Sequence, residues 1–351
     1  MADEPDPLQT IALPPPNLSV ELIGRHVGEE YGLDGELVSL VSERDQNFRL
    51  TTESERRYVV KIANSAEHPT STDFQIQALL HMEKNGCGVA VPRVIPTLGG
   101  AASTTVSGQN SDHTLRVVSY LPGRPLDDIT IDSAIAGQLG RCLAEVDLAL
   151  RDFEHPGDGQ PLLWDMRRAA ELRGLLPYIE DGDLRATIRA CLNDFEKNAA
   201  PKFASLRSQV IHNDVNPGNV LVTEDESMSI AGVIDFGDMI RAPLIIDVAI
   251  AASYMRSDDE DASALIASLV AGYDDVIRLE DAELELLHDL VRMRLATTIA
   301  ILHLRLSARA GDDAYTIGSL QGEQSAGRFL ARINAMSRSE FADRMQKERG
   351  G

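Results

Sequence analysis

The 351-residue sequence is poor in cysteine and in lysine, and both scarcities narrow its interpretation. Its three cysteines are widely spaced and include no C-x-x-C pair, so neither a zinc site nor a disulfide framework is expected. A reducing compartment suits such a chain. Only five lysines occur beside 28 arginines, so a lysine at a special position is unusually informative.

Several common functional motifs are also missing. The sequence contains no G-x-x-x-x-G-K-[ST] phosphate loop, no glycine fingerprint for a dinucleotide and no H-E-x-x-H metal motif. A G-x-S-x-G elbow is absent too. These absences argue against P-loop enzymes, dinucleotide-dependent enzymes, zinc proteases of that type and the commonest serine hydrolases.

Positive charge is scarce, since the formal net charge is −22, and the longest apolar runs are short or interrupted. We therefore expect no nucleic acid partner and no membrane partner. The charge suits a cationic small substrate, but it is also what a solubilising surface would have. The N-terminal stretch has no basic region followed by an apolar one, so we expect a cytoplasmic protein.

The hydrophobic pattern changes character along the chain. Residues 1–17 are acidic and proline-rich and are expected to be a flexible tail. Residues 18–118 combine helical spacing after Ser19 with a β-rich meander and a helix at 69–85. We predict an α+β fold with a small β-rich N-lobe (18–118), a hinge connector (119–127) and a larger, mainly helical C-lobe (128–351), with a ligand cleft between the lobes.

Within the C-lobe the periodicity predicts a succession of helices with one short β island at 209–235. The expected helices span about 131–152, 163–178, 183–200, 243–256, 260–277 and 280–310.

The β island carries the most informative residues. The stretch "VIHNDVNPGNVLV" (210–222) delivers His212, Asp214 and Asn219 close to a strand end, and "GVIDFGDM" ends a second apolar run at Asp235. A hairpin between the two runs would bring Asn219 and Asp235 to the same end. An amide oxygen and a carboxylate there would suit Mg²⁺, and Asp214 could accept a proton from an attacking hydroxyl.

This spacing, H-x-D-x-x-x-x-N followed by D-F-G, is typical of protein-kinase-like phosphotransferases. In "RRYVVKI", Lys61 lies on a strand of the β-rich lobe, where kinases carry the lysine that pairs with nucleotide phosphates. His212 is expected to brace the loop rather than move protons. Asp247, in an otherwise apolar stretch, is expected to bond the loop backbone.

The hairpin "VSERDQNFRL" could cover a nucleotide, with Ser42, Gln46 and Asn47 as donors to phosphates. It lacks the glycines of G-x-G-x-x-G, so a plain turn is an equal alternative.

After "DFG" only six residues separate Gly237 from Pro243, where an apolar helix begins. That leaves no platform for a peptide, so the acceptor is expected to be a small molecule.

The chain resembles the aminoglycoside phosphotransferase and choline kinase superfamily, and within it most closely the hydroxylysine kinase group. Besides the motifs above, "LRVVSYLPGRPL" and "LLWDMRRA" carry the resemblance. It implies a bilobal protein-kinase-like fold in a monomer or homodimer. It makes Asp214 the catalytic base and places Mg²⁺ on Asn219 and Asp235. The nucleotide would meet Lys61, Ser42, Asn47 and the backbone of Ser119, Tyr120 and Leu121.

The resemblance also implies the reaction: transfer of the γ-phosphoryl group of ATP or GTP to a hydroxyl of an amino acid or amino-alcohol, with 5-hydroxylysine as the leading acceptor. Asp238 and Trp164 are the substrate-site candidates. Homoserine, ethanolamine, choline or an aminoglycoside remain alternative acceptors, and a catalytically silent nucleotide-binding protein is the alternative from another class. Where the resemblance leads us to look for the glutamate partner of the strand lysine, the helix at 69–85 offers Gln75 and Gln77. Either a glutamine suffices there, or the alignment with the family is shifted, or Lys61 is oriented differently.

Overall fold

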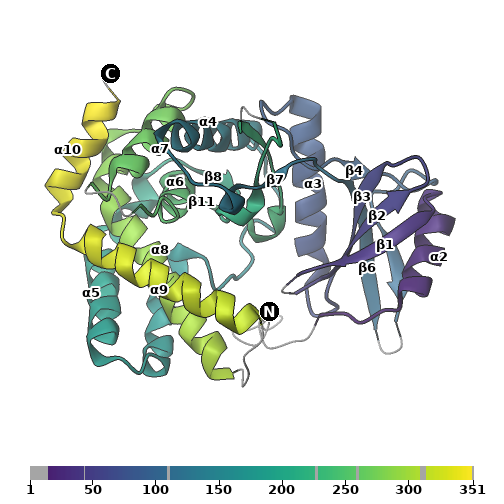
Figure 1. Cartoon of the computed structure of the whole chain (residues 1–351), viewed down its shortest axis with the longest axis horizontal. Coiled ribbons are helices and arrows are strands. Elements are labelled where there is room, and N and C mark those ends of the chain that lie inside the picture. Colours follow the sequence, from purple (N-terminus) through teal and green to yellow (C-terminus); the bar gives the residue numbers. More distant parts are fainter. Residues whose placement is uncertain are drawn as a thin grey trace.

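The computed structural model describes residues 15–42, 44–108, 111–225, 228–257, 261–308 and 314–349, with the backbone alone for 308 and 314–319. Most of the predicted tail (1–14) lies outside these ranges. The chain forms a small antiparallel β lobe at one end and a larger helical lobe at the other (Figure 1). The predicted α+β class, with a small β-rich N-lobe and a larger, mainly helical C-lobe, is therefore confirmed.

The sheet of the N-lobe forms because its middle strands bury alternate apolar side chains. Phe48 and Leu50 of one strand and Val60 and Ile62 of the next are buried on the same side. The strands pair in the order β1-β2-β3-β6-β4, and β5 also pairs with β6. They are β1 (Gly35–Leu40), β2 (Gln46–Thr52), β3 (Arg57–Ile62), β4 (Val94–Ile95), β5 (Thr104–Ser107) and β6 (Asp112–Ser119).

Two helices flank this sheet. Helix α2 (Val20–Tyr31) begins at Ser19, whose side chain accepts a hydrogen bond from the Leu22 backbone, and it ends at Gly32 with a left-handed φ of 65°. Helix α3 (Pro69–Asn85) stands between the sheet and the C-lobe (Figure 1). Phe74 of α3 stacks on Phe153 of the C-lobe with ring centroids 5.8 Å apart, so α3 packs against both lobes.

The connector runs from β6 through β7 (Arg124–Pro125) and the 3₁₀ turn η1 (Leu126–Asp128) to the first helix of the C-lobe. Strand β7 pairs with β9 (Val220–Val222), which in turn pairs with β10 (Ile230–Val233). A second small ladder joins β8 (Ser208–Ile211) to β11 (Ile240–Pro243). The chain between the lobes is thus attached directly to the hairpin that carries the polar motifs.

The C-lobe is helical, as predicted, with two corrections. The predicted helix at 163–178 is a 3₁₀ segment, η2 (Met166–Tyr178), in which Arg168 departs from helical geometry and Pro177 removes a backbone donor. Two helices beyond residue 310 were not predicted. The helices are α4 (Ser133–Ala149), α5 (Gly182–Asn198), α6 (Ile245–Ala252), α7 (Ala264–Asp274), α8 (Asp281–Ala308), α9 (Ala314–Asn334) and α10 (Arg338–Glu348); η3 (Ala200–Ser205) is a further 3₁₀ turn.

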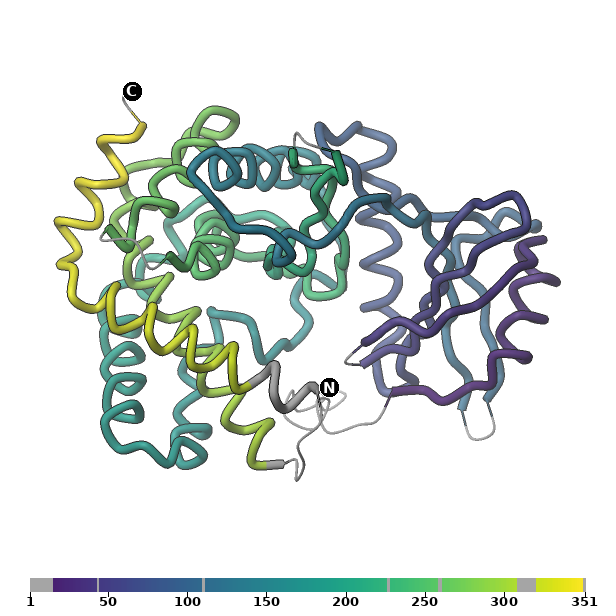
Figure 2. The backbone as a smooth tube through the Cα atoms, viewed as in Figure 1, coloured from purple at the N-terminus to yellow at the C-terminus, as the bar shows by residue number. Residues whose placement is uncertain are grey.

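The helices of the C-lobe pack into a buried core next to the segments that carry the polar motifs (212–219 and 235–238). All eight residues of α6 are buried, and α8 packs against α5, α6, η2 and α9. Figure 2 follows the chain to its last helices, α9 along α8 and α10 against α7 and α8. Among the described residues, no helix combines the length and apolar character that crossing a membrane requires.

Candidate active site

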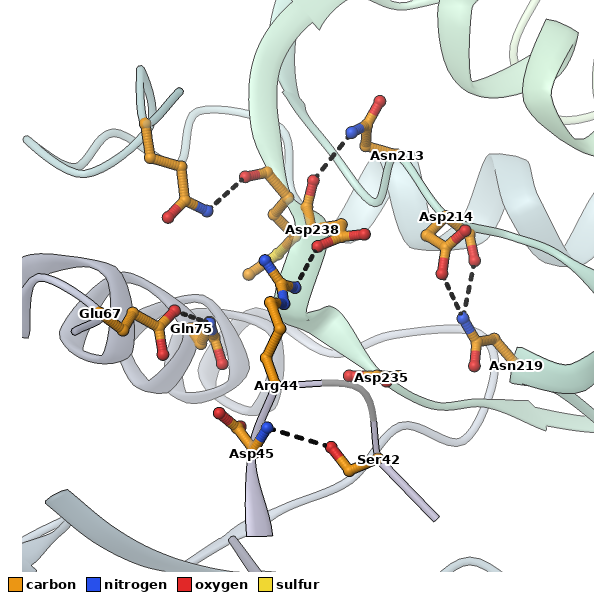
Figure 3. Close-up of polar contacts among 12 residues, drawn as sticks. Ser42, Arg44, Asp45, Glu67, Gln75, Asn213, Asp214, Asn219, Asp235 and Asp238 are labelled. Atoms are coloured by element: carbon orange, nitrogen blue, oxygen red, sulfur yellow. Dashed lines mark hydrogen bonds and ion pairs between the residues drawn. The ribbon is translucent and has the colours of Figure 1, made fainter. Parts of the chain in front are cut away.

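The predicted hairpin between β9 and β10 is confirmed. Val220 pairs with Val233, and the Ile234 backbone N–H donates to the Asn219 carbonyl at 2.9 Å. Asn219 therefore ends the turn η4 (Pro217–Asn219) at the same end of the hairpin as Asp235, which precedes the turn η5 (Phe236–Asp238). The structure thus places Asn219 and Asp235 on adjacent chain segments, with Asp214 close by (Figure 3).

Asp214 is held by amides and by one arginine. The Asn219 side chain donates through Nδ2 to Asp214 Oδ2 at 2.8 Å and to its backbone oxygen at 2.9 Å, and Asn216 Nδ2 donates to Oδ2 at 3.0 Å. Arg294 Nη2 lies 3.4 Å from Oδ1. Poor hydration within the cleft, and secondly the negative charge of Asp238, raise the pKa of Asp214 to about 7. A carboxyl group with that pKa suits proton transfer near neutral pH.

Asp235 has the opposite electrostatic character. Its Oδ1 accepts a hydrogen bond from Lys61 Nζ at 3.2 Å, and the charge of Lys61 lowers the pKa of Asp235 to about 2. Its backbone adopts a left-handed φ of 62°, a strained conformation for a residue other than glycine. The ionised carboxylate reaches Lys61 on β3 of the other lobe, so it lies between the two lobes. Two neighbouring carboxyl groups thus differ strongly in proton affinity, as groups with separate roles do.

The loop that carries Asp214 (residues 212–219) is held in place by the buried side chains of Asp247 and His212. Asp247 on α6 accepts hydrogen bonds from the backbone N–H of His212 at 2.9 Å and of Asn213 at 2.8 Å. His212 Nδ1 accepts from the Asp214 N–H at 3.3 Å, so Nε2 carries the proton and donates to the Ile234 carbonyl at 3.1 Å. Burial lowers the pKa of His212, which keeps the ring neutral. These contacts are those of structural supports.

A second carboxyl group, Asp147 on α4, lies beside Asp247. Burial, together with the charge of Asp247, raises the pKa of Asp147, and Tyr273 Oη donates to its Oδ2 at 2.7 Å. Burial raises the pKa of Asp247 as well, but the two backbone N–H groups that donate to Asp247 stabilise its charged form. We therefore assign the negative charge to Asp247 and the proton to Asp147. A protonated carboxyl group resembles a carboxamide in shape and charge, whereas a carboxylate does not. The same change to asparagine at Asp147 and at Asp247 therefore tests which of the two carries the charge.

We expect Asp247→Asn to lower the free energy of unfolding by about 2–4 kcal/mol, because the new NH₂ group cannot accept from one of the two buried N–H groups. Asp147→Asn retains an oxygen for Tyr273 and should cost about 1 kcal/mol or less. Urea unfolding of both variants measures the difference. Equal losses would contradict the assignment of the negative charge to Asp247.

Two connected cavities open between the lobes. The larger, of about 380 Å³, lies between the strand residues Val59 and Val118 and the hairpin residue Ile234, and it is lined in part by Ser119, Tyr120, Leu121, Asn47 and Lys61. The smaller, of about 110 Å³, is lined mostly by polar groups, including Ser42, Lys61, Asp214 and Asp235. The structure therefore gathers Ser42, Asn47, Lys61 and residues 119–121 around these cavities. Gln46, the remaining candidate, lines neither cavity, because its side chain bonds the backbone N–H and carbonyl of Leu18 instead. An apolar slot for a planar base that leads to a charged compartment is the form expected of a nucleotide site.

The residues fit a divalent cation. Each hydrogen bond of Asn219 in the described chain that involves its side chain comes from Nδ2, so its amide oxygen is available, and Asp235 is ionised. The described ranges contain no group of three or more His, Cys, Asp or Glu side chains that would form a complete protein cage. Two oxygen ligands that leave the remaining positions to phosphate oxygens and water are what Mg²⁺ prefers.

Neither Gln75 nor Gln77 forms a hydrogen bond with Lys61 in the described chain. Gln77 donates to Asp73 at 3.3 Å on the exposed side of α3. Gln75 lines both cavities with Lys61, but its side-chain oxygen accepts from the buried Arg116 and its nitrogen donates to Glu67 at 3.3 Å. Lys61 instead pairs with Asp235 across the cleft.

Four site residues escaped the sequence analysis: Arg44, Glu67, Arg116 and Arg294. Arg44 Nη2 lies 2.5 Å from Asp238 Oδ1, which joins the loop between β1 and β2 to the C-lobe (Figure 3). Asp238 also accepts a hydrogen bond from Asn213 Nδ2 through its backbone oxygen at 3.0 Å. Of these four residues, only Arg44 could have been suspected from the sequence, because it lies in the hairpin that could cover a nucleotide.

Trp164, the second predicted substrate residue, lies outside both cavities. Its ring stacks under the guanidinium groups of Arg294, 4.7 Å from the ring centroid, and Arg305, 5.5 Å away. Because Arg294 also contacts Asp214, Trp164 is linked to the site through that arginine. Asp238, by contrast, lines the smaller cavity beside Asp214.

Comparison with known proteins matches this geometry. A family model described as the phosphotransferase enzyme family matches residues 37–293. The chain is similar to hydroxylysine kinase of Mus musculus (26% identity, 75% of each chain) and of Danio rerio (26% identity, 94% of this chain and 95% of the relative). A solved structure of amicoumacin kinase in complex with AMP-PNP, Ca²⁺ and Ami has the same fold, with a TM-score of 0.67 at 17% identity over 91% of this chain and 94% of that one.

Proposed function

The chain belongs to the phosphotransferase enzyme family, and we propose that it transfers the γ-phosphoryl group of Mg²⁺-bound ATP or GTP to a hydroxyl group of a small amino acid or amino-alcohol. As a phosphotransferase with an alcohol group as acceptor, it shares its chemistry with the kinases to which it is similar. The likeness to hydroxylysine kinases over most of the chain makes 5-hydroxylysine the first acceptor to test.

One observation carries the proposal: Asp214, with its raised pKa, and Asp235, with its lowered pKa, share one polar compartment with Lys61. In the proposed reaction the acceptor oxygen forms a bond to the γ-phosphorus while the bond to the β–γ bridging oxygen breaks. The hydroxyl proton passes to Asp214. Lys61 holds phosphate oxygens, and Asn219 and Asp235 would hold Mg²⁺, which neutralises charge on the phosphates.

Hydrogen bonds from neighbouring residues keep Asp214, the proposed base, in position. Asn216 and Asn219 direct one oxygen of Asp214, and Asp247 fixes the backbone of the loop that carries it. The apolar cavity next to Tyr120 and Leu121 offers a surface for the purine. Phosphoryl transfer depends on such positioning, because the protein contributes little covalent chemistry.

The test is release of nucleoside diphosphate with Mg²⁺ and either ATP or GTP, across 5-hydroxylysine, homoserine, ethanolamine, choline and kanamycin. Acceptor-dependent turnover with 5-hydroxylysine is the expected result. Turnover with another acceptor would preserve the reaction and replace the substrate. Tight nucleotide binding without turnover of any acceptor would favour a catalytically silent protein and contradict the proposal.

The pH dependence follows from the pKa of Asp214. A general base acts in its ionised form, so kcat/KM for the nucleotide, which reports the free enzyme, should rise with pH through about 7 and level off above it. Initial rates between pH 5.5 and 9 at constant ionic strength measure this profile. A profile that is flat across this range, or that falls from pH 6 to 8, would exclude Asp214 as the base.

A further inference from the structure

Arg294 is buried beside Asp214, the proposed base, and most of its N–H donors have no hydrogen-bond acceptor. It lies on α8 with a side chain only 1% exposed and is the largest fully buried side chain in the described part of the protein. Its Nη2 atom lies 3.4 Å from Asp214 Oδ1, while Nε and Nη1 are buried without a hydrogen-bond partner. A guanidinium group has five N–H donors, so most of its hydrogen-bonding capacity is unused.

Burying a charged group in this state is costly unless an anion completes its surroundings. Asp214 is a weak counter-ion, because its Oδ2 is engaged by Asn216 and Asn219 and its other oxygen is at long range from Arg294. The free donors of Arg294 therefore indicate that a further anionic group is bound there during function.

Neighbouring residues fix the guanidinium and add positive charge. The Trp164 ring, stacked at 4.7 Å, holds its plane, and Arg305 reaches the same ring. Arg256 is close enough for the charge of Arg294 to help lower its pKa, after the larger effect of burial. Arg256 donates hydrogen bonds to the carbonyls of Ser253 and Gly322. Three arginines, Arg256, Arg294 and Arg305, therefore lie close together in a chain whose net charge is −22.

We propose that Arg294 binds the carboxylate group of the acceptor, so that the enzyme selects hydroxylated amino acids over hydroxylated amines that lack a carboxylate. This inference rests on the proposed function, since it takes Asp214 as the group that receives the proton of the acceptor hydroxyl. Arginine suits the task because its planar fork matches the two oxygens of a carboxylate. Trp164 acts as a positioning residue that keeps the fork in plane.

A nucleotide phosphate is the other source of an anion near Asp214. The placement of Arg294 favours the acceptor, because neither Arg294 nor Trp164 lines the two cavities that suit the nucleotide. Lys61 and Arg44 already supply positive charge there. Arg294 Nη2 instead lies 3.4 Å from Asp214, the group proposed to take the proton of the acceptor hydroxyl.

Trp164 is the only tryptophan in the sequence, so its fluorescence reports on ligands beside Arg294. Binding is measured with Mg²⁺ and AMP-PNP or GMP-PNP present, using two matched pairs. They are 5-hydroxylysine with 1,5-diaminopentan-2-ol, and homoserine with 3-amino-1-propanol, which differ only by the carboxylate. We expect at least one carboxylated member to bind about 100-fold more tightly than its partner.

In Arg294→Gln this preference should fall to within about threefold, while the surface variant Arg173→Gln keeps it. Amines that bind as well as the amino acids, no binding of either amino acid, or an Arg294→Gln variant that loses only nucleotide affinity would each overturn the inference. If Arg294→Gln does not fold, judged by circular dichroism, the wild-type pairs still decide it.

Turnover measured on the same compounds separates this inference from the proposed function. Equal turnover of both members of each pair would preserve the kinase reaction and reject the role of Arg294. Preferential binding of the amino acids without turnover of any compound would preserve the carboxylate site and reject the kinase reaction.

Discussion

Replacing Asp214 by asparagine is expected to lower kcat about 1,000-fold while the affinity for Mg²⁺–nucleotide changes less than about threefold. Asparagine preserves the size of the side chain and still offers an oxygen to Asn216 and Asn219, but it cannot take the hydroxyl proton. Steady-state rates with the best acceptor give kcat, and titration with a non-hydrolysable nucleotide gives the affinity.

The control for this variant is Asp112→Asn, at an exposed position of β6 in the N-lobe. It makes the same chemical change away from the cleft and should leave kcat within about twofold. Retention of more than a tenth of the wild-type kcat in Asp214→Asn would show that Asp214 is not the base.

Replacing Asp235 by asparagine should weaken the apparent affinity for Mg²⁺ about 100-fold and lower the rate at 1 mM Mg²⁺ about 1,000-fold. Lys61 holds the pKa of Asp235 at about 2, so this carboxylate is charged between pH 5.5 and 9 and would be the stronger of the two proposed metal ligands. A neutral amide removes that charge and leaves Lys61 without its partner.

The measurement is the rate as a function of Mg²⁺ concentration at fixed nucleotide. Partial recovery of Asp235→Asn at high Mg²⁺ would be consistent with loss of a ligand, whereas recovery is not expected for Asp214→Asn. An unchanged Mg²⁺ dependence in Asp235→Asn would remove Asp235 from the metal site.

Local patterns in the sequence were enough for the main features of the fold and the site. Ser19 marks the start of α2, and the apolar runs around residues 220 and 233 identify the hairpin that joins Asn219 to Asp235. Asp247 was recognisable because a carboxylate in an apolar stretch needs a buried partner. The boundaries of the tail, lobes and hinge, and the roles of the site residues, stay predictions.

What could not be predicted depends on distant pairing or on weak patterns. Residues 166–178 have the side-chain spacing of an α-helix, and only their backbone geometry makes them 3₁₀. Helix α10 is strongly polar, and its identity depends on two buried residues, Phe341 and Met345, and a capping box at Ser337. The contact of Arg294 with Asp214 joins positions 80 residues apart and leaves no local trace in the sequence.

The ion pair between Lys61 and Asp235 has a thermodynamic consequence. In the proposed reaction cycle, phosphate oxygens replace Asp235 as the partner of Lys61, and the cation replaces Lys61 as the partner of Asp235. The first ligand to bind, nucleotide or Mg²⁺, breaks the ion pair. The residue that this ligand does not contact is then free to bind the second ligand. Linkage then requires the coupling to be reciprocal: Mg²⁺ raises the affinity for free nucleotide by the same factor as nucleotide raises the affinity for Mg²⁺.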